Sequence, residues 1–319
     1  MKQQLLMARL CDDNVTAEEK SASLQSVTAG DITGEMLAAC AQYLLKNAVP
    51  LEIEARDAID VCGTGGDKSR NDVKTFNIST AAAFVLAAGG VPVIKHGNRA
   101  VSSSSGSSDV LEALGVTVCT TPAQAKEHYS RHNLCFVAAP AFHPLLLKLA
   151  PVRKALGKPT FLNLLGPLCN PARTKKQVIG VFDLQFLQPM AEAARLLGKT
   201  DVMAVHSEDG LDELSISAPT HIYRLKDGKI SHDKILPEDI GIKTAAIEAL
   251  RGGTAAQNAA IIRDIFSGAQ GPAADIVCLN AAAGFVVAGR EPDLKHGFCR
   301  AQQVIADGLA LKKLSEIKE

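Results

Sequence analysis

Strand-like and helix-like segments alternate from residue 58 to the middle of this 319-residue chain. A short strand is predicted from Ala58 to Val61, and helix and strand then follow one another repeatedly. Each helix can carry the chain back across a sheet, so the strands are expected to pair in parallel. The expected elements are helix 79–88, strand 91–94, helix 109–114, strand 116–119, helix 122–130, strand 134–138, strand 177–182, helix 189–197 and strand 201–205. The predicted fold is α/β, with a mostly parallel central sheet.

The segment before this alternation has helical periodicity and no strand signal. Thr16 and Glu19 have the spacing of a capping box at a helix start. Residues 143–171 interrupt the alternation, with one helix expected after His143 and a second starting at Pro151. We therefore predict a small all-helical domain at 1–57, joined by a returning segment at about 143–171, and a large α/β domain at 58–319. A hairpin is expected at 223–230, with helices after it.

The composition limits the possible partners. Lys plus Arg and Asp plus Glu number 34 each, so no net charge draws the chain to nucleic acid or to anionic membranes. The apolar run before Arg9 is too short for a secretory signal, and residues 81–94 are interrupted by glycine and proline. The eight cysteines form no CxxC pair, which favours reduced thiols. We expect a soluble, cytoplasmic protein.

Two glycine-bearing stretches carry the functional signal. The first, DVCGTGGD at 60–67, follows the predicted strand and contains Gly63, Gly65 and Gly66, whose amides could converge on an anion. Ser79 and Thr80 begin the next helix, where unpaired N–H groups favour phosphate. A plain turn explains either feature alone, because GTGGD matches neither common nucleotide-binding pattern.

The second stretch, KHGNRAVSS at 95–103, adds positive charge and hydroxyl groups. Lys95 and Arg99 supply fixed charge, and Ser102, Ser103 and Ser107 can donate to phosphate oxygens. It too could be a solvated turn. The two stretches follow successive strands, and ligands of parallel sheets gather at the carboxyl ends of strands. Together they predict a site for a polyphosphorylated ligand.

Several further residues have alternative interpretations. Asp212 and Glu213 can ligate Mg²⁺ with substrate phosphates, and Ser79 could add a hydroxyl, although adjacent acids are more often a solvated loop. Arg153 could bind a carboxylate or form a structural ion pair. His143 is interpreted as a helix-start residue, and no nucleophilic triad is apparent.

These motifs, with 139–172, 210–215 and Asn280-Ala-Ala-Ala, resemble anthranilate phosphoribosyltransferase of tryptophan biosynthesis. The resemblance runs from about residue 58 to the end. It implies a small helical domain plus an α/β domain, Mg²⁺ as cofactor and a homodimer through the N-terminal helices. The implied reaction transfers 5-phosphoribosyl from phosphoribosyl pyrophosphate to the amine of anthranilate and releases pyrophosphate.

The resemblance also assigns residues. It places the phosphoribosyl pyrophosphate contacts on Gly63, Gly66, Asp67, Thr75, Asn77, Ser79, Thr80, Lys95, Asn98, Arg99, Ser102, Ser103 and Ser107. It places the anthranilate contacts on Gly63, His96, Asn98 and Arg153, and the metal on Ser79, Asp212 and Glu213. It assigns no acid, base or nucleophile, because the expected catalysis is electrostatic and positional.

Two other functions remain open at this point. A pyrimidine nucleoside phosphorylase-like enzyme shares the architecture and also works at an anomeric carbon. The Asp-Glu pair and the KHGNR run favour the transferase over it. A non-catalytic homologue that binds nucleic acid would be expected to have a basic surface and no acidic pair.

Overall fold

The computed structural model of the chain describes residues 2–65, 72–98 and 105–318. Its sheet has the strand order β3-β2-β1-β4-β5-β6-β7, with β1 (Ile59–Val61), β2 (Val93–Gly97), β3 (Leu134–Ala138), β4 (Lys176–Gly180), β5 (Asp201–Ser207), β6 (Thr220–Lys226) and β7 (Lys229–Ile235). Strands β1 to β5 pair in parallel, and β6 and β7 add an antiparallel hairpin. The predicted mostly parallel sheet and the hairpin are confirmed.

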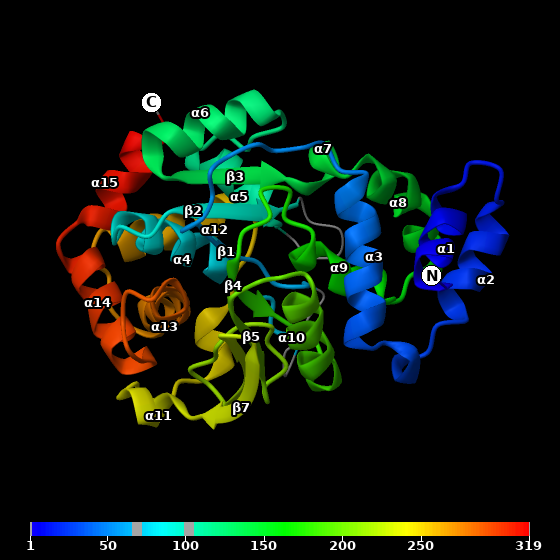
Figure 1. Cartoon of the computed structure of the whole chain (residues 1–319). Helices are drawn as coiled ribbons and strands as arrows, with labels where there is room; N and C mark the ends of the chain where they lie inside the picture. The colour runs from blue at the N-terminus through cyan, green and yellow to red at the C-terminus, as the bar shows by residue number, and fades with distance from the viewer. Residues whose placement is uncertain (1, 66–71, 99–104, 319) are drawn as a thin grey trace.

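Helices lie on both sides of this sheet (Figure 1). They are α1 (Lys2–Cys11), α2 (Ala17–Gln25), α3 (Gly34–Lys46), α4 (Ile78–Ala88), α5 (Ser107–Leu114), α6 (Pro122–His132), α7 (Ala139–Phe142), α8 (Pro144–Leu156), α9 (Leu162–Leu168), α10 (Leu187–Leu196), α11 (Pro237–Ile240), α12 (Ala255–Phe266), α13 (Pro272–Ala288), α14 (Leu294–Ala306) and α15 (Leu309–Glu316), with 3-10 turns η1 (Ala29–Asp31), η3 (Leu184–Phe186) and η4 (Ile247–Leu250).

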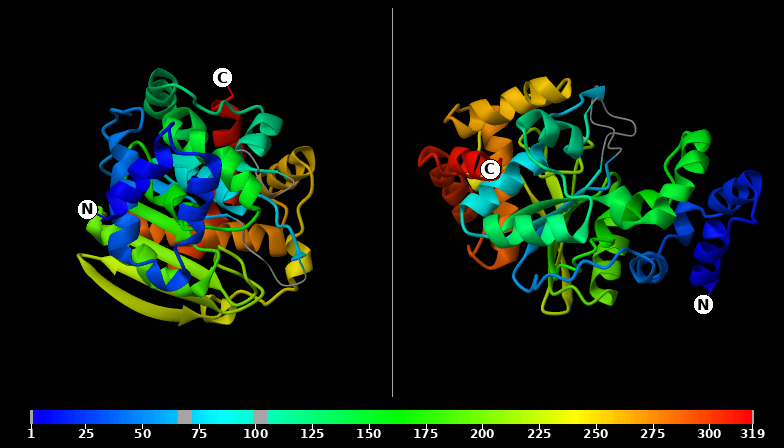
Figure 2. Two further views of the ribbon diagram at one scale, coloured as in Figure 1. Left: turned by 90° about the vertical axis from the view of Figure 1, so that its right-hand side faces the viewer. Right: turned by 90° about the horizontal axis from the view of Figure 1, so that it is seen from above.

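The N-terminal helices project from the α/β body beside α8, as the view from above shows (Figure 2). The capping box at Thr16 is present, with Glu19 N donating to the Thr16 hydroxyl at 3.2 Å and Thr16 N to the Glu19 carboxylate at 2.9 Å. The small helical domain is thus an observed feature. Its boundaries at 57 and at 143–171 stay a prediction.

Two expected elements were wrong. Residues 116–119 form no strand, and only an isolated parallel bridge joins Cys119 to Val137. The helix after His143 continues through Pro151 as the single helix α8. Pro151 has no backbone N–H and so removes one hydrogen bond from the interior of α8, but it does not start a new helix.

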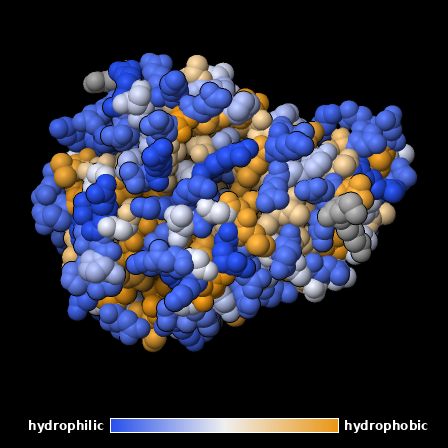
Figure 3. Space-filling model, in the orientation of Figure 1, coloured by the Kyte–Doolittle hydropathy of each residue, from blue (hydrophilic) through white to orange (hydrophobic). Residues whose placement is uncertain are grey.

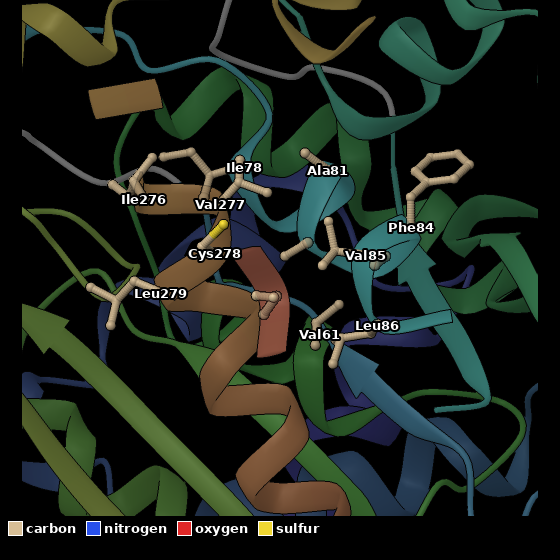
Figure 4. Packing of buried hydrophobic residues seen from close by; sticks show 14 of the residues in the cluster. Val61, Ile78, Ala81, Phe84, Val85, Leu86, Ile276, Val277, Cys278 and Leu279 are labelled. Atoms are coloured by element: carbon tan, nitrogen blue, oxygen red, sulfur yellow. The ribbon is translucent and has the colours of Figure 1, made fainter. Parts of the chain in front are cut away.

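The core beside β1 depends on small residues. Helix α4 is almost wholly buried, and it packs its apolar side chains against those of α13, which is also largely apolar (Figure 4). A Cβ on Gly284 would lie 2.5 Å from Leu86 Cδ1, and one on Gly297 would lie 2.9 Å from Ala282 Cα. Small residues therefore let α13 lie close to α4 and α14, and this packing holds α4 under the candidate site.

The face in Figure 3 is mostly hydrophilic, and hydrophobic residues reach the surface around the waist between the two parts of the molecule. No helix among residues 2–65, 72–98 and 105–318 is both long and apolar enough to cross a membrane.

Candidate active site

The turns after β1 and β5 meet at the carboxyl edge of the sheet. The Gly65 amide donates to Asp212 Oδ2 at 2.9 Å. A Cβ on Gly63 would lie 2.4 Å from the same oxygen, so only glycine allows this approach. The structure therefore brings the first glycine stretch into contact with Asp212, one of the predicted metal ligands. It also corrects one expectation, since the Gly65 amide binds a carboxylate of the protein and is not left for phosphate.

Asp212 sits deep in this contact. The residue is 9% exposed, and burial raises its pKa, while the Gly65 hydrogen bond and the charges of His206 and Lys95 act against that rise. Glu213 is less buried and lines a small cavity together with Ser79 and Gly63. That cavity measures about 10 Å³, which is room for one water or one small ion. A phosphorylated sugar has to bind outside it.

Lys95 ties the second glycine stretch to the first. It is 4% exposed, and its Nζ donates to the Val61 carbonyl and, at 3.2 Å, to Ser79 Oγ. The ammonium thus lies at the start of α4, beside the position where phosphate is expected. The Ser79 hydroxyl accepts a hydrogen bond from the Lys95 ammonium. The assignment of Ser79 as a metal ligand stays a prediction.

The polar residues before α4 and α5 are joined by hydrogen bonds. Asn77 Nδ2 donates to the Ser105 carbonyl at 3.2 Å, and Asn258 Nδ2 donates to Asn77 Oδ1 at 3.0 Å. Ser107 Oγ donates to the Asn98 carbonyl at 3.1 Å. Thr75 forms a bridge with Arg251, and Thr80 is buried in α4. These predicted residues therefore lie on connected segments.

The remaining predicted phosphate residues, Gly66, Asp67, Arg99, Ser102 and Ser103, lie outside the described residues.

His96 is buried beside His143. Their ring centroids are 5.2 Å apart, at an interplanar angle of 65°. His96 Nδ1 donates to the Gly166 carbonyl at 3.2 Å, and His143 Nε2 donates to the Cys169 carbonyl at 2.6 Å. The other nitrogen of each ring is buried without a partner among the described residues. Two such nitrogens are a place where a polar ligand group or a water can bind.

Arg153 lies in α8, partly buried, and burial lowers the pKa of its guanidinium. None of the hydrogen bonds or ion pairs between described residues uses that guanidinium, although its backbone carbonyl accepts from Gly157. The structural ion pair considered from the sequence is thus not found in the described part of the chain. A partly buried arginine with open donors suits a ligand carboxylate.

Thiol chemistry has no place at this edge. Cys62 follows β1, and burial raises the pKa of its thiol to about 12. It is therefore protonated at neutral pH and is not a nucleophile.

Known proteins are similar to this chain in both sequence and fold. The family model described as "Glycosyl transferase family, a/b domain" matches residues 55–311. The anthranilate phosphoribosyltransferase of Petrotoga mobilis is 42% identical over 313 residues, which is 98% of this chain and 90% of that protein. The chain belongs to the anthranilate phosphoribosyltransferase family. It is accordingly an enzyme of the glycosyltransferase type.

Solved structures agree with this assignment. The anthranilate phosphoribosyltransferase of Thermus thermophilus superposes with a TM-score of 0.91 at 39% identity, covering 99% of this chain and 94% of that one. The enzyme from Saccharomyces cerevisiae in complex with PRPP and Mg gives 0.87 at 26% identity, covering 99% and 90%. None of these relatives is a phosphorylase or a nucleic-acid-binding protein by name.

Sequence reasoning missed the residues that hold the acidic loop. Asn280, buried in α13, accepts from Leu214 N at 3.0 Å and donates to the Leu214 carbonyl at 2.9 Å. Ser215 Oγ donates to Asp209 Oδ2 at 2.5 Å. The Asn280 segment was part of the family resemblance, but only the fold shows that this amide pairs with the backbone next to Glu213.

Asp60 was also missed as a connecting residue. It is fully buried in β1, accepts from His96 N at 3.2 Å and from Asn170 Nδ2 at 2.9 Å, and burial raises its pKa. It therefore joins the strand before the first glycine stretch to the backbone of His96.

Gly180→Ala is expected to displace Asp212 and Glu213, the predicted metal ligands. A Cβ there would lie 1.7 Å from the Asp212 carbonyl oxygen, so β4 or the acidic loop must move. We expect kcat to fall at least about tenfold, in line with the loss of a positioned electrostatic group. Gly30→Ala, where the nearest atom would be 3.9 Å away, is the matched control for steady-state kinetics. Equal activity of the two variants would contradict the close approach.

Acid should destabilise the fold through His96. Burial, followed by the charge of His143, lowers its pKa from 6.5 to about 3. Between pH 6.5 and about 3, the unfolded chain therefore binds a proton at His96 that the folded chain does not bind. The contribution of neutral His96 to the free energy of unfolding is fully present above pH 6.5 and is lost as the pH falls toward 3. The loss is about 1.4 kcal/mol per pH unit.

Urea unfolding of the wild type and of His96→Gln between about pH 7.5 and 5.0 measures this slope. The variant curve should be flatter by that amount, and contributions of opposite sign, such as that of Asp60, cancel because both proteins share them. Parallel curves would show that His96 is not held neutral.

Proposed function

We propose that the candidate active site performs the family reaction with the residues described above. The chain transfers the 5-phosphoribosyl group from phosphoribosyl pyrophosphate to the amine of anthranilate, releasing pyrophosphate, as a step of tryptophan biosynthesis. The observation that carries the residue assignment is the contact of the Gly63–Gly65 turn with Asp212. It joins a predicted phosphate loop to a predicted metal ligand across the carboxyl edge of the sheet.

The residues at this edge fit Mg²⁺. Among the described residues no group of three or more His, Cys, Asp or Glu side chains is arranged around a metal position. Mg²⁺ commonly takes one or two carboxylates and completes its shell with substrate phosphates and water. Asp212 and Glu213 provide the two carboxylates, and Glu213 and Ser79 line one ion-sized cavity. When bound, Mg²⁺ supplies positive charge to the leaving pyrophosphate.

The chain itself provides position and charge. Lys95 brings a buried ammonium to the start of α4, where backbone N–H groups also favour phosphate. We assign the other phosphate contacts to Gly66, Asp67, Arg99, Ser102 and Ser103, as the family resemblance implies. The amine of anthranilate is neutral at about pH 7, so it needs orientation more than deprotonation.

The acceptor is proposed to bind between Arg153, His96 and Asn98, with Gly63 near its amine. The guanidinium of Arg153 has no partner in the described part of the chain, so its donors can bind the carboxylate of anthranilate. The partnerless ring nitrogen of His96 can accept a hydrogen bond from the ligand. Bringing amine and anomeric carbon together in this way supplies much of the rate enhancement expected without a general base.

A direct assay tests the proposal. The protein is incubated with anthranilate, phosphoribosyl pyrophosphate and Mg²⁺, and the loss of anthranilate fluorescence is followed. Fluorescence should fall only when all three are present. Phosphate-dependent cleavage of thymidine or uridine, without loss of anthranilate, would instead identify a nucleoside phosphorylase.

We also propose a cytoplasmic homodimer that associates through the N-terminal helices. Leu5 of α1 and Leu147 of α8 are 65% and 58% exposed, and both belong to the projecting helical part. Sedimentation velocity tests the association: the wild type should be a dimer, and the Leu5→Ser/Leu147→Ser variant should dissociate. A monomeric wild type would refute it.

A further inference from the structure

A second charged cavity lies away from the candidate active site. It has a volume of about 490 Å³, within the usual range of small-molecule sites. Lys46, Arg173, Lys175 and Lys199 line it, and no Asp or Glu is among its lining residues in the described part of the chain. We call it the basic cavity.

The position of the basic cavity separates it from the catalytic edge. Lys175 directly precedes β4 and Lys199 lies just before β5, so both are at the amino-terminal ends of parallel strands. Gly63 and Asp212 follow the carboxyl ends of β1 and β5. Strands rise about 3.3 Å per residue, so the amino-terminal and carboxyl-terminal edges of the sheet are more than about 10 Å apart.

Lys199 lies at the bottom of the basic cavity and is buried. The residue is 8% exposed, and its Nζ donates one hydrogen bond among the described residues, to the Thr174 carbonyl at 2.9 Å. Burial lowers its pKa to about 8, with Asp60 acting in the opposite direction. The hydroxyl of Thr174, another lining residue, is buried without a partner among the described residues. Within the described part of the chain the Lys199 ammonium therefore has two N–H groups without an acceptor, which a bound anion could provide.

Helix ends explain only part of the positive charge. Helices α3 and α10 end at the cavity, and there Arg173 Nη2 donates to the Leu45 carbonyl at 3.4 Å and Lys175 Nζ to the Gly198 carbonyl at 3.1 Å. Two helix ends supply together about one negative charge. Asp60, which reaches the cavity through Asn170, supplies at most one more. The cavity therefore keeps an excess of positive charge, which favours an anion over a neutral ligand.

We propose that the basic cavity binds a phosphate dianion, as inorganic phosphate or as the phosphate end of a small phosphomonoester. Lys199 would contact its oxygens at the deepest part of the cavity. The exposed Lys46, Arg173 and Lys175 would surround it at the mouth. The volume leaves room for a group larger than phosphate itself, so both sources are tested.

Charge-matched variants can assign phosphate binding to this cavity. In the cavity variant, Lys46→Gln, Arg173→Asn and Lys175→Gln remove three exposed cations; asparagine suits the Arg173 position, whose φ is +53°. In the control variant, Lys226→Gln, Lys229→Gln and Lys243→Gln remove three exposed cations elsewhere. The candidate active site is intact in both, so its own phosphate binding is the same.

Isothermal titration with inorganic phosphate, and separately with ribose 5-phosphate, gives the readout. The cavity variant should lose one class of binding or bind at least about tenfold more weakly than the control, in line with lost charge-assisted hydrogen bonds. Weaker binding of both probes supports a phosphomonoester site, and weaker binding of inorganic phosphate alone supports free phosphate. Equal binding by the two variants overturns the proposal.

Two further measurements keep the test decisive. Crystals of the wild type soaked in tungstate should show an anomalous peak in the cavity, and Lys199→Met should abolish it. If the cavity variant instead changes the subunit number in sedimentation while phosphate binding persists, acidic side chains of a second copy fill the cavity and the proposal is wrong.

Discussion

Asp212→Asn combined with Glu213→Gln is expected to lower kcat/KM for phosphoribosyl transfer at least about 10³-fold. Both changes keep side-chain shape and remove negative charge. Asparagine at 212 retains an oxygen that can accept from the Gly65 amide, so the turn after β1 should stay in place. The loss then reports the charge that holds the cation, and not a collapsed loop.

The measurement is initial rate against Mg²⁺ concentration, with the melting temperature as a check on folding. Glu127→Gln with Asp264→Asn removes the same charge from exposed positions on α6 and α12 and serves as the control. Wild-type kcat/KM in the double variant would show that the acidic pair is only a solvated loop, the alternative that the sequence left open.

Arg153→Ala is expected to raise KM for anthranilate about 10- to 100-fold and to change KM for phosphoribosyl pyrophosphate less than about threefold. The guanidinium has no partner among the described residues, so its removal breaks no ion pair of the protein there. A charge-assisted hydrogen bond to a carboxylate has the energy that corresponds to this change in KM.

Lys154→Ala, which removes the neighbouring exposed charge of α8, is the matched control. Steady-state kinetics with each substrate varied in turn separates the two effects. Similar increases for both substrates, or a lowered melting temperature with unchanged KM, would make Arg153 a structural residue.

The comparison of prediction with structure is clearest at two segments. The proline at position 151 was interpreted as a helix start, yet α8 runs through it: a proline favours the first turn of a helix but does not exclude an interior position. The segment 116–119 has strand-like composition but makes only one isolated bridge. Local propensity cannot decide whether a partner strand has free hydrogen-bonding groups.

The residues that support the site were harder to find than those that form it. His143 directly precedes α8, as predicted, but only the fold shows that its ring lies edge-on against His96. Asn280 and Asp60 act through hydrogen bonds to backbone groups far along the chain. Such roles depend on which loop lies opposite, and no spacing rule in one sequence contains that information.

By itself, the sequence of this protein determined the strand-helix alternation, the hairpin and the small helical part, because these follow from local periodicity, capping and turn residues. It also identified the family through motifs with a specific order. Only the tertiary structure decided that Gly65 binds Asp212, that Arg153 keeps open donors among the described residues and that four cations share one cavity. Those features depend on contacts between distant segments, which packing of the whole chain alone brings within bonding distance.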